Sequence, residues 1–168
     1  MFRRFRRELG IFRRYPGVLA AAAFLGAFGG ILLWVNGTAA PLVYRMTNMP
    51  KAAPGFTLCF LLWLAVYGLA GFQIGCALVP PLLKKCGTLR YAAVSVIVYT
   101  LLLAWYPLFF SIVHGVFACI VLLLSIGLQL YFFFALAIRV CTLILPACLL
   151  LFLEGYFFVI TFLYILAN

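Results

Sequence analysis

Five long stretches of apolar residues constrain this chain more than any other feature. They cover residues 17–35, 56–79, 91–113, 116–138 and 142–166. A helix needs about 20 mostly apolar residues to cross the ~30 Å hydrocarbon core of a bilayer. These stretches are apolar on every face, whereas the strands of a membrane barrel alternate between apolar and polar residues. The sequence therefore predicts an all-α integral membrane protein, a bundle of five transmembrane helices formed by residues 17–168.

Composition and charge agree with this class. Of the 168 residues, 69% are hydrophobic and 8% are charged, so a water-soluble fold would expose far too much apolar surface. Short cytoplasmic loops retain Lys and Arg, and all 12 basic residues except Arg45 and Lys51 lie before the first span or in the second and fourth loops. This alternation predicts that the N-terminus lies inside and the C-terminus outside. The positive charge is then explained by topology and lipid headgroups, without a nucleic-acid partner.

The first 16 residues form a separate predicted segment. Phe2, Phe5, Leu9 and Phe12 recur at helical spacing among arginines, and Pro16 ends the pattern. Such a basic amphipathic segment is expected to lie flat on the lipid headgroups, as a membrane anchor or as a partner-binding arm. The positive-inside bias favours a prokaryotic cell membrane, and the Arg-rich start leaves a mitochondrial or other organelle membrane as the alternative.

The sequence offers little chemistry for catalysis. Its six cysteines are scattered singly, without CxxC or Cys/His spacing. No Ser/His/Asp set or phosphate-binding loop is present, and the chain has two acidic residues in all. We therefore expect no enzymatic activity, no catalytic residue, no metal site and no cofactor.

Glu154 is the acidic residue that needs an explanation. It lies near the middle of the fifth span, where a lipid-exposed carboxylate costs a few kcal/mol even on mild insertion scales. It should therefore face the bundle interior. One interpretation is a neutral side chain hydrogen-bonded to Tyr67 or Ser125 of a neighbouring helix. The other is functional, either as a polar contact in a ligand cavity or as a proton-carrying group.

Small residues form a strip in each of the first two spans: Ala22, Gly26 and Gly30 at four-residue intervals, then Gly68, Gly71 and Gly75. Such strips let another helix approach closely. They predict either packing inside one bundle or a homodimer interface.

The first loop and second span resemble a known family. The segment VYRMTNMPKAAPGFTLCFLLWLAVYGLAG, residues 43–71, resembles the TspO/translocator protein family, also called peripheral benzodiazepine receptors or tryptophan-rich sensory proteins. Its matching positions are Tyr44, Pro50, Pro54, Trp63, Tyr67 and Gly71. In the third span, AWYPLFF at residues 104–110 is similar to the family's NWAWPPLFF. Tryptophans of the family correspond here to Ala52 and Leu150.

The resemblance implies a five-helix bundle, often a homodimer, whose cavity is capped by the first loop and binds flat hydrophobic molecules such as tetrapyrroles. The residues expected to line this site are Tyr44, Pro50, Ala52, Trp63, Tyr67, Trp105, Phe109, Leu150 and Glu154. Independently of the resemblance, a proline-containing loop is stiff enough for a lid, and Trp and Tyr offer stacking faces with polar handles. These aromatics are also common in interfacial belts and in helix packing.

Three functions follow as hypotheses. The first is a membrane-embedded binding or sensing protein, a receptor for porphyrin-like or other lipophilic molecules. The alternative is a small proton-coupled carrier in which Glu154 is the coupling group. A third is a lipid-facing scaffold of a larger complex.

Overall fold

The computed structural model describes residues 15–36, 48–77, 79, 88–110, 115–135, 137 and 141–168. In this part of the chain it has no strand and five helices: α2 (Gly17–Asn36), α4 (Phe56–Ala77), α6 (Thr88–Phe110), α7 (Gly115–Ala135) and α8 (Cys141–Ala167). Each is long and apolar enough to cross a membrane. The predicted all-α protein with five spans is therefore confirmed, and the chain is a multi-pass membrane protein.

The helix boundaries lie close to the predicted spans. The largest shifts are of three residues: α6 runs from Thr88 to Phe110 where 91–113 was predicted, and α7 ends at Ala135 where 138 was predicted. α4 ends at Ala77, two residues early. Pro80 and Pro81 follow α4 in the sequence, and a proline disfavours helical backbone at the residue before it. The predicted interfacial segment, except for Tyr15 and Pro16, lies outside the described residues, and so does Tyr44.

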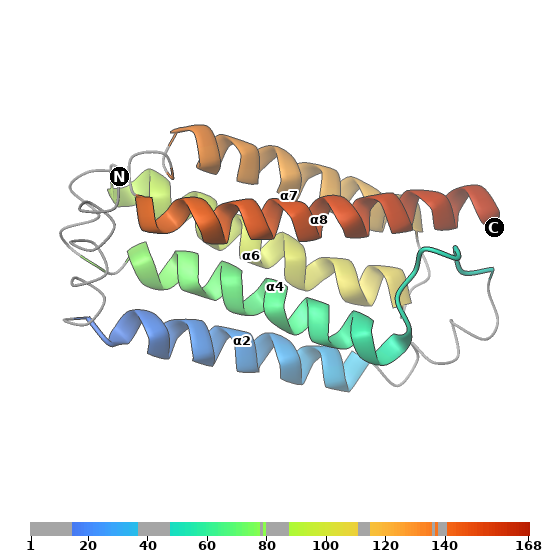
Figure 1. Cartoon of the computed structure of the whole chain (residues 1–168), viewed down its shortest axis with the longest axis horizontal. Helices are drawn as coiled ribbons and strands as arrows, with labels where there is room; N and C mark the ends of the chain where they lie inside the picture. The colour runs from blue at the N-terminus through green and yellow to red at the C-terminus, as the bar shows by residue number, and fades with distance from the viewer. Residues whose placement is uncertain are drawn as a thin grey trace.

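Successive helices run in opposite directions along the bundle (Figure 1). We call the end at which α2, α6 and α8 begin the Arg90 end, after the exposed Arg90 near the start of α6. The opposite end, where residues 48–55 lead into α4, is the Pro54 end. α2 packs along α4, while α4, α6, α7 and α8 surround a common interior, with α6 against α7, α7 against α8, and α4 against both α6 and α8.

The outer surface carries large apolar side chains on every helix. The most exposed include Phe24 and Trp34 on α2, Phe134 on α7 and Phe152 on α8. Contiguous apolar surface of this kind needs a nonaqueous environment. It matches the lipid-facing surface of a membrane bundle.

The glycine strips are used inside this one chain, between α2 and α4. A Cβ added at Gly71 would meet Leu25 Cβ at 2.9 Å, and one added at Gly75 would meet the Val18 carbonyl oxygen at 2.8 Å. In lipid, such close backbone contact supplies the packing energy that holds helices together. The first of the two predicted uses of the strips therefore describes this structure.

We predict that Gly75→Ala destabilises the protein. The added methyl group would press on the α2 backbone, and overpacking of this kind costs about 1–3 kcal/mol. Gly127→Ala is the matched control, because a Cβ there meets nothing within 4 Å. Thermal unfolding in one detergent should show a lower melting temperature for Gly75→Ala alone. Equal melting temperatures for the two variants would contradict the α2–α4 contact.

Candidate functional site

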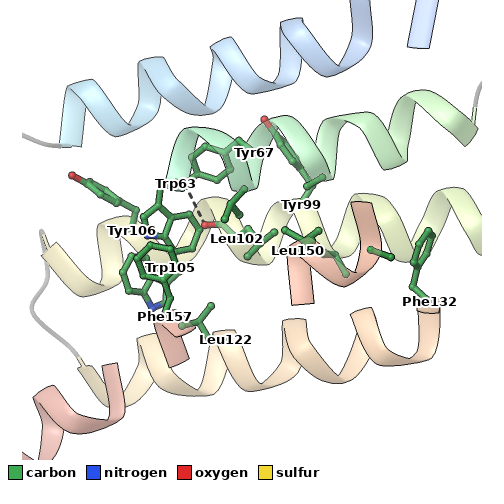
Figure 2. Packing of buried hydrophobic residues seen from close by; sticks show 14 of the residues in the cluster. Trp63, Tyr67, Tyr99, Leu102, Trp105, Tyr106, Leu122, Phe132, Leu150 and Phe157 are labelled. Carbon is green, nitrogen blue, oxygen red and sulfur yellow. Dashed lines mark hydrogen bonds between the residues drawn. The ribbon is translucent and has the colours of Figure 1, made fainter. Parts of the chain in front are cut away.

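An aromatic cluster fills the interior toward the Pro54 end. The Trp63 ring of α4 stacks on the Trp105 ring of α6, with centroids 4.5 Å apart and planes 17° from parallel. Trp105 stacks in turn on Phe109 at 4.9 Å, and Phe157 of α8 lies 4.7 Å from Trp63. Figure 2 shows Trp63, Trp105 and Phe157 gathered between their helices. We call these four residues the aromatic cluster.

The two indole N–H groups of the cluster have different surroundings. Trp105 Nε1 donates a hydrogen bond of 3.3 Å to Thr161 Oγ1 on α8. Trp63 is 0% exposed, yet its Nε1 has no hydrogen-bond partner among the described residues. A buried N–H that donates to nothing is rare in native proteins. Trp63 therefore offers an unused donor beside its stacking face.

Tyr67 lies one turn from Trp63 but points toward the α2 side. Its ring lies 5.6 Å from Trp63 and 6.1 Å from Tyr99, and a Cβ at Gly29 of α2 would collide with it. Its hydroxyl donates to the Leu102 carbonyl at 3.4 Å, the dashed line in Figure 2. Tyr67 thus joins α2, α4 and α6 at the edge of the aromatic cluster.

The segment before α4 lies against the C-terminal half of α8 (Figure 1). The Tyr156 hydroxyl donates to the Ala52 carbonyl at 3.0 Å. Asn168 accepts from the Asn48 backbone N–H at 3.1 Å and donates to its carbonyl at 3.2 Å. Pro54 is buried. These contacts place residues 48–55 at the end of the bundle that holds the aromatic cluster.

Glu154 lies midway along α8, one turn from Phe157 of the aromatic cluster. At 1.5 Å per residue it is about 20 Å from either end of its helix. The side chain is 0% exposed, and Ser125 Oγ, at the middle of α7, donates to Glu154 Oε1 at 3.0 Å. The second oxygen, Oε2, is buried with no partner in the described ranges. The prediction that Glu154 faces the interior, with Ser125 as one candidate partner, is confirmed.

Three further polar side chains are buried between Glu154 and the Arg90 end: Gln73 on α4, Ser95 on α6 and Gln129 on α7. We call them the amide layer. Both amide groups and the Ser95 hydroxyl lack hydrogen-bond partners in the described part of the chain. These residues were missed in the sequence analysis. The signal in the sequence is a polar side chain inside an otherwise apolar span. Two of these three side chains are amides.

The buried polar atoms without a hydrogen-bond partner carry a large cost in folding free energy. The amide layer and Glu154 Oε2 together contribute six buried atoms without a described partner. Each unpaired buried polar group costs about 1–3 kcal/mol, whereas the whole net stability of a domain is about 5–15 kcal/mol. Buried polar groups in native proteins are normally hydrogen-bonded, so a polar partner beside these side chains would stabilise the bundle.

The structure brings most of the predicted site residues into one interior. Trp63, Trp105 and Phe109 form the aromatic cluster with Phe157, and Leu150 and Glu154 lie on the inner face of α8. Ala52 is exposed and takes part through its backbone carbonyl, and Pro50 lies in the same segment. Within the described ranges, no group of three or more His, Cys, Asp or Glu side chains comes together that could hold a metal ion.

We predict that Trp63→Ala destabilises the protein strongly. The variant removes a fully buried ring that stacks on Trp105 and packs against Phe157, and such truncations cost about 3–5 kcal/mol. Trp34→Ala is the control, because Trp34 is 76% exposed on the outer face of α2. Thermal melts in detergent should separate the two variants clearly. Similar melting temperatures would show that Trp63 lies in an interfacial belt.

Comparison with known proteins adds no relative. A scan against models of protein families found no match, and searches of curated proteins and of solved structures found none. The resemblance to the TspO/translocator protein family therefore stays a prediction from the motifs.

Proposed function

We propose that this chain is a membrane-embedded binding or sensing protein for a flat, hydrophobic molecule of the tetrapyrrole class. The observation that carries the proposal is the placement of the aromatic cluster. Its stacked rings lie under residues 48–55 and one helical turn from a buried carboxyl group with an unused oxygen. Ligand sites of this kind combine apolar and aromatic walls with a few polar groups that fix orientation.

Each part of the interior has a counterpart in such a ligand. The faces of Trp63 and Trp105 suit a planar conjugated ring, and the Trp63 N–H and Glu154 Oε2 offer a donor and an acceptor. Because the two indoles stack on each other at 4.5 Å, a flat ligand binds by taking the place of one ring contact. The segment at residues 48–55 must then move, and its hydrogen bonds to Tyr156 and Asn168 are the contacts that open.

The membership in the TspO/translocator protein family, the orientation with the N-terminus inside, and a prokaryotic cell membrane are part of the same proposal. Their support is the motif pattern and the distribution of basic residues. A homodimer would use a surface other than the glycine strips, since Gly71 and Gly75 already pack against α2.

A second candidate is a proton-coupled carrier with Glu154 as the coupling group. The observation that favours it is the amide layer, whose unpartnered polar side chains lie next to Glu154 on the side toward the Arg90 end. Carriers place their binding and coupling groups near the middle of the membrane.

The binding proposal predicts saturable quenching of tryptophan fluorescence by protoporphyrin IX in nanodiscs. Trp63→Phe should raise Kd by about 2–10-fold, because a ring contact is worth about 0.5–1.5 kcal/mol. Glu154→Gln should also weaken binding. Trp34→Phe, a change on the outer face, is the matched control. Partitioning that never saturates, or equal effects of Trp63→Phe and Trp34→Phe, would contradict the proposal.

The carrier proposal makes a separate prediction for proteoliposomes. An imposed pH gradient should drive uptake of the same porphyrin, and Glu154→Gln should abolish the dependence on the gradient because its side chain cannot carry a proton. Thr100→Ala, a change at an exposed position of α6, should leave uptake intact. Saturable binding without any flux would exclude the carrier and leave the binding protein.

A further inference from the structure

The amide layer occupies one height of the bundle, on three different helices. Trp63 of α4 stacks on Trp105 of α6, so these two residues lie at the same height. The two helices are antiparallel, and Gln73 comes ten residues after Trp63 while Ser95 comes ten residues before Trp105. Gln73 and Ser95 therefore also lie at the same height. On α6 and α7, the Tyr91 and Phe132 rings lie 5.2 Å apart, which brings Ser95 level with the turn that contains Gln129. All three side chains are buried, so they face the interior and not the lipid.

The Glu154–Ser125 pair lies one helical turn from this layer, toward the Pro54 end. Ser125 and Gln129 are four residues apart on α7, so they share a face of the helix. At the height of the layer α8 contributes Leu150 and the small Ala147, because Ser125 faces Glu154 and the two helices are antiparallel. Glu154 Oε2 and the amide layer therefore belong to one polar region.

The three side chains do not satisfy one another. Each glutamine side chain offers two donors and an acceptor, yet neither side-chain amide has a hydrogen-bond partner among the described residues, and the same holds for Ser95 Oγ. Polar groups that share a buried space without direct contact are commonly bridged by ordered water, which makes about three hydrogen bonds to such groups.

We propose that the amide layer is a water-binding site whose bound water also hydrogen-bonds Glu154 Oε2. Water is the occupant that fits, because the site mixes donors and acceptors of neutral amides, a hydroxyl and one carboxyl oxygen. An anion is disfavoured at this site, because it would lie against the electron-rich oxygen of the Glu154 carboxyl group.

Aromatic side chains enclose this site from both ends. Toward the Arg90 end the Tyr91 and Phe132 rings pack on each other, and the Tyr91 hydroxyl donates to the Gln73 carbonyl at 2.7 Å. Toward the Pro54 end lies the aromatic cluster. The water is therefore internal, and it gives the carboxyl group of Glu154 a polar surrounding in the middle of an apolar bundle. This inference does not depend on the flat-ligand proposal.

The test uses the fact that the chain has two glutamines, Gln73 and Gln129. Selective ¹⁵N labelling of Gln and Trp in the lipid-reconstituted protein yields a small set of side-chain signals. In a water-edited solid-state NMR experiment, both glutamine amides should receive magnetisation from water several-fold faster than the Trp105 indole N–H, which is buried to the same degree and bonded to Thr161. Glutamine amides that build up no faster than the Trp105 signal would overturn the proposal.

A variant gives a second readout. Gln129→Leu removes the amide that α7 contributes to the water site. It should strongly reduce the transfer of magnetisation from water to the remaining Gln73 amide. It should also lower the melting temperature, whereas in a dry site the loss of an orphaned amide would raise it. Unchanged indole shifts of Trp63 and Trp105 would show that the variant keeps the fold. An unchanged Gln73 water signal in a correctly folded variant would contradict a shared site.

Discussion

The hydrogen bond between Ser125 and Glu154 is the constraint on which the rest of the interior depends. A carboxyl group in the middle of a membrane helix cannot face lipid without a cost of several kcal/mol. Glu154 lies at the centre of α8 and Ser125 at the centre of α7, and the bond between them is 3.0 Å long. It therefore fixes the rotation of both helices. With that rotation set, Phe157 on α8 and Gln129 on α7 also face inward.

This rotation divides the interior into two unlike halves. Toward the Pro54 end the helices contribute stacked rings, which gain energy from contact with one another and with flat apolar groups. Toward the Arg90 end they contribute amides and a hydroxyl, which gain energy only from polar partners. Glu154 lies at the boundary. A molecule that is flat and apolar with a polar group at its edge or centre matches this division better than a purely apolar one.

Sequence reasoning predicted the scaffold well because the constraint it used is strong: five apolar runs have to become five helices. It also predicted that Glu154 faces inward, with Ser125 as a candidate partner. It did not decide whether the glycine strips pack within the chain or between chains, since small-residue spacing is the same in both cases. The amide layer escaped notice because Gln73 and Gln129 are 56 residues apart in the chain, and only the antiparallel register of the helices brings them level.

The most direct test of this account is a double-mutant cycle on Ser125 and Glu154. Unfolding free energies in one detergent would be measured for Ser125→Ala, Glu154→Gln and the double variant. A hydrogen bond to a buried carboxyl group predicts a coupling energy of about 1–3 kcal/mol. Single effects that add to within about 0.5 kcal/mol would contradict the bond, and with it the rotation of α7 and α8 that places both halves of the interior.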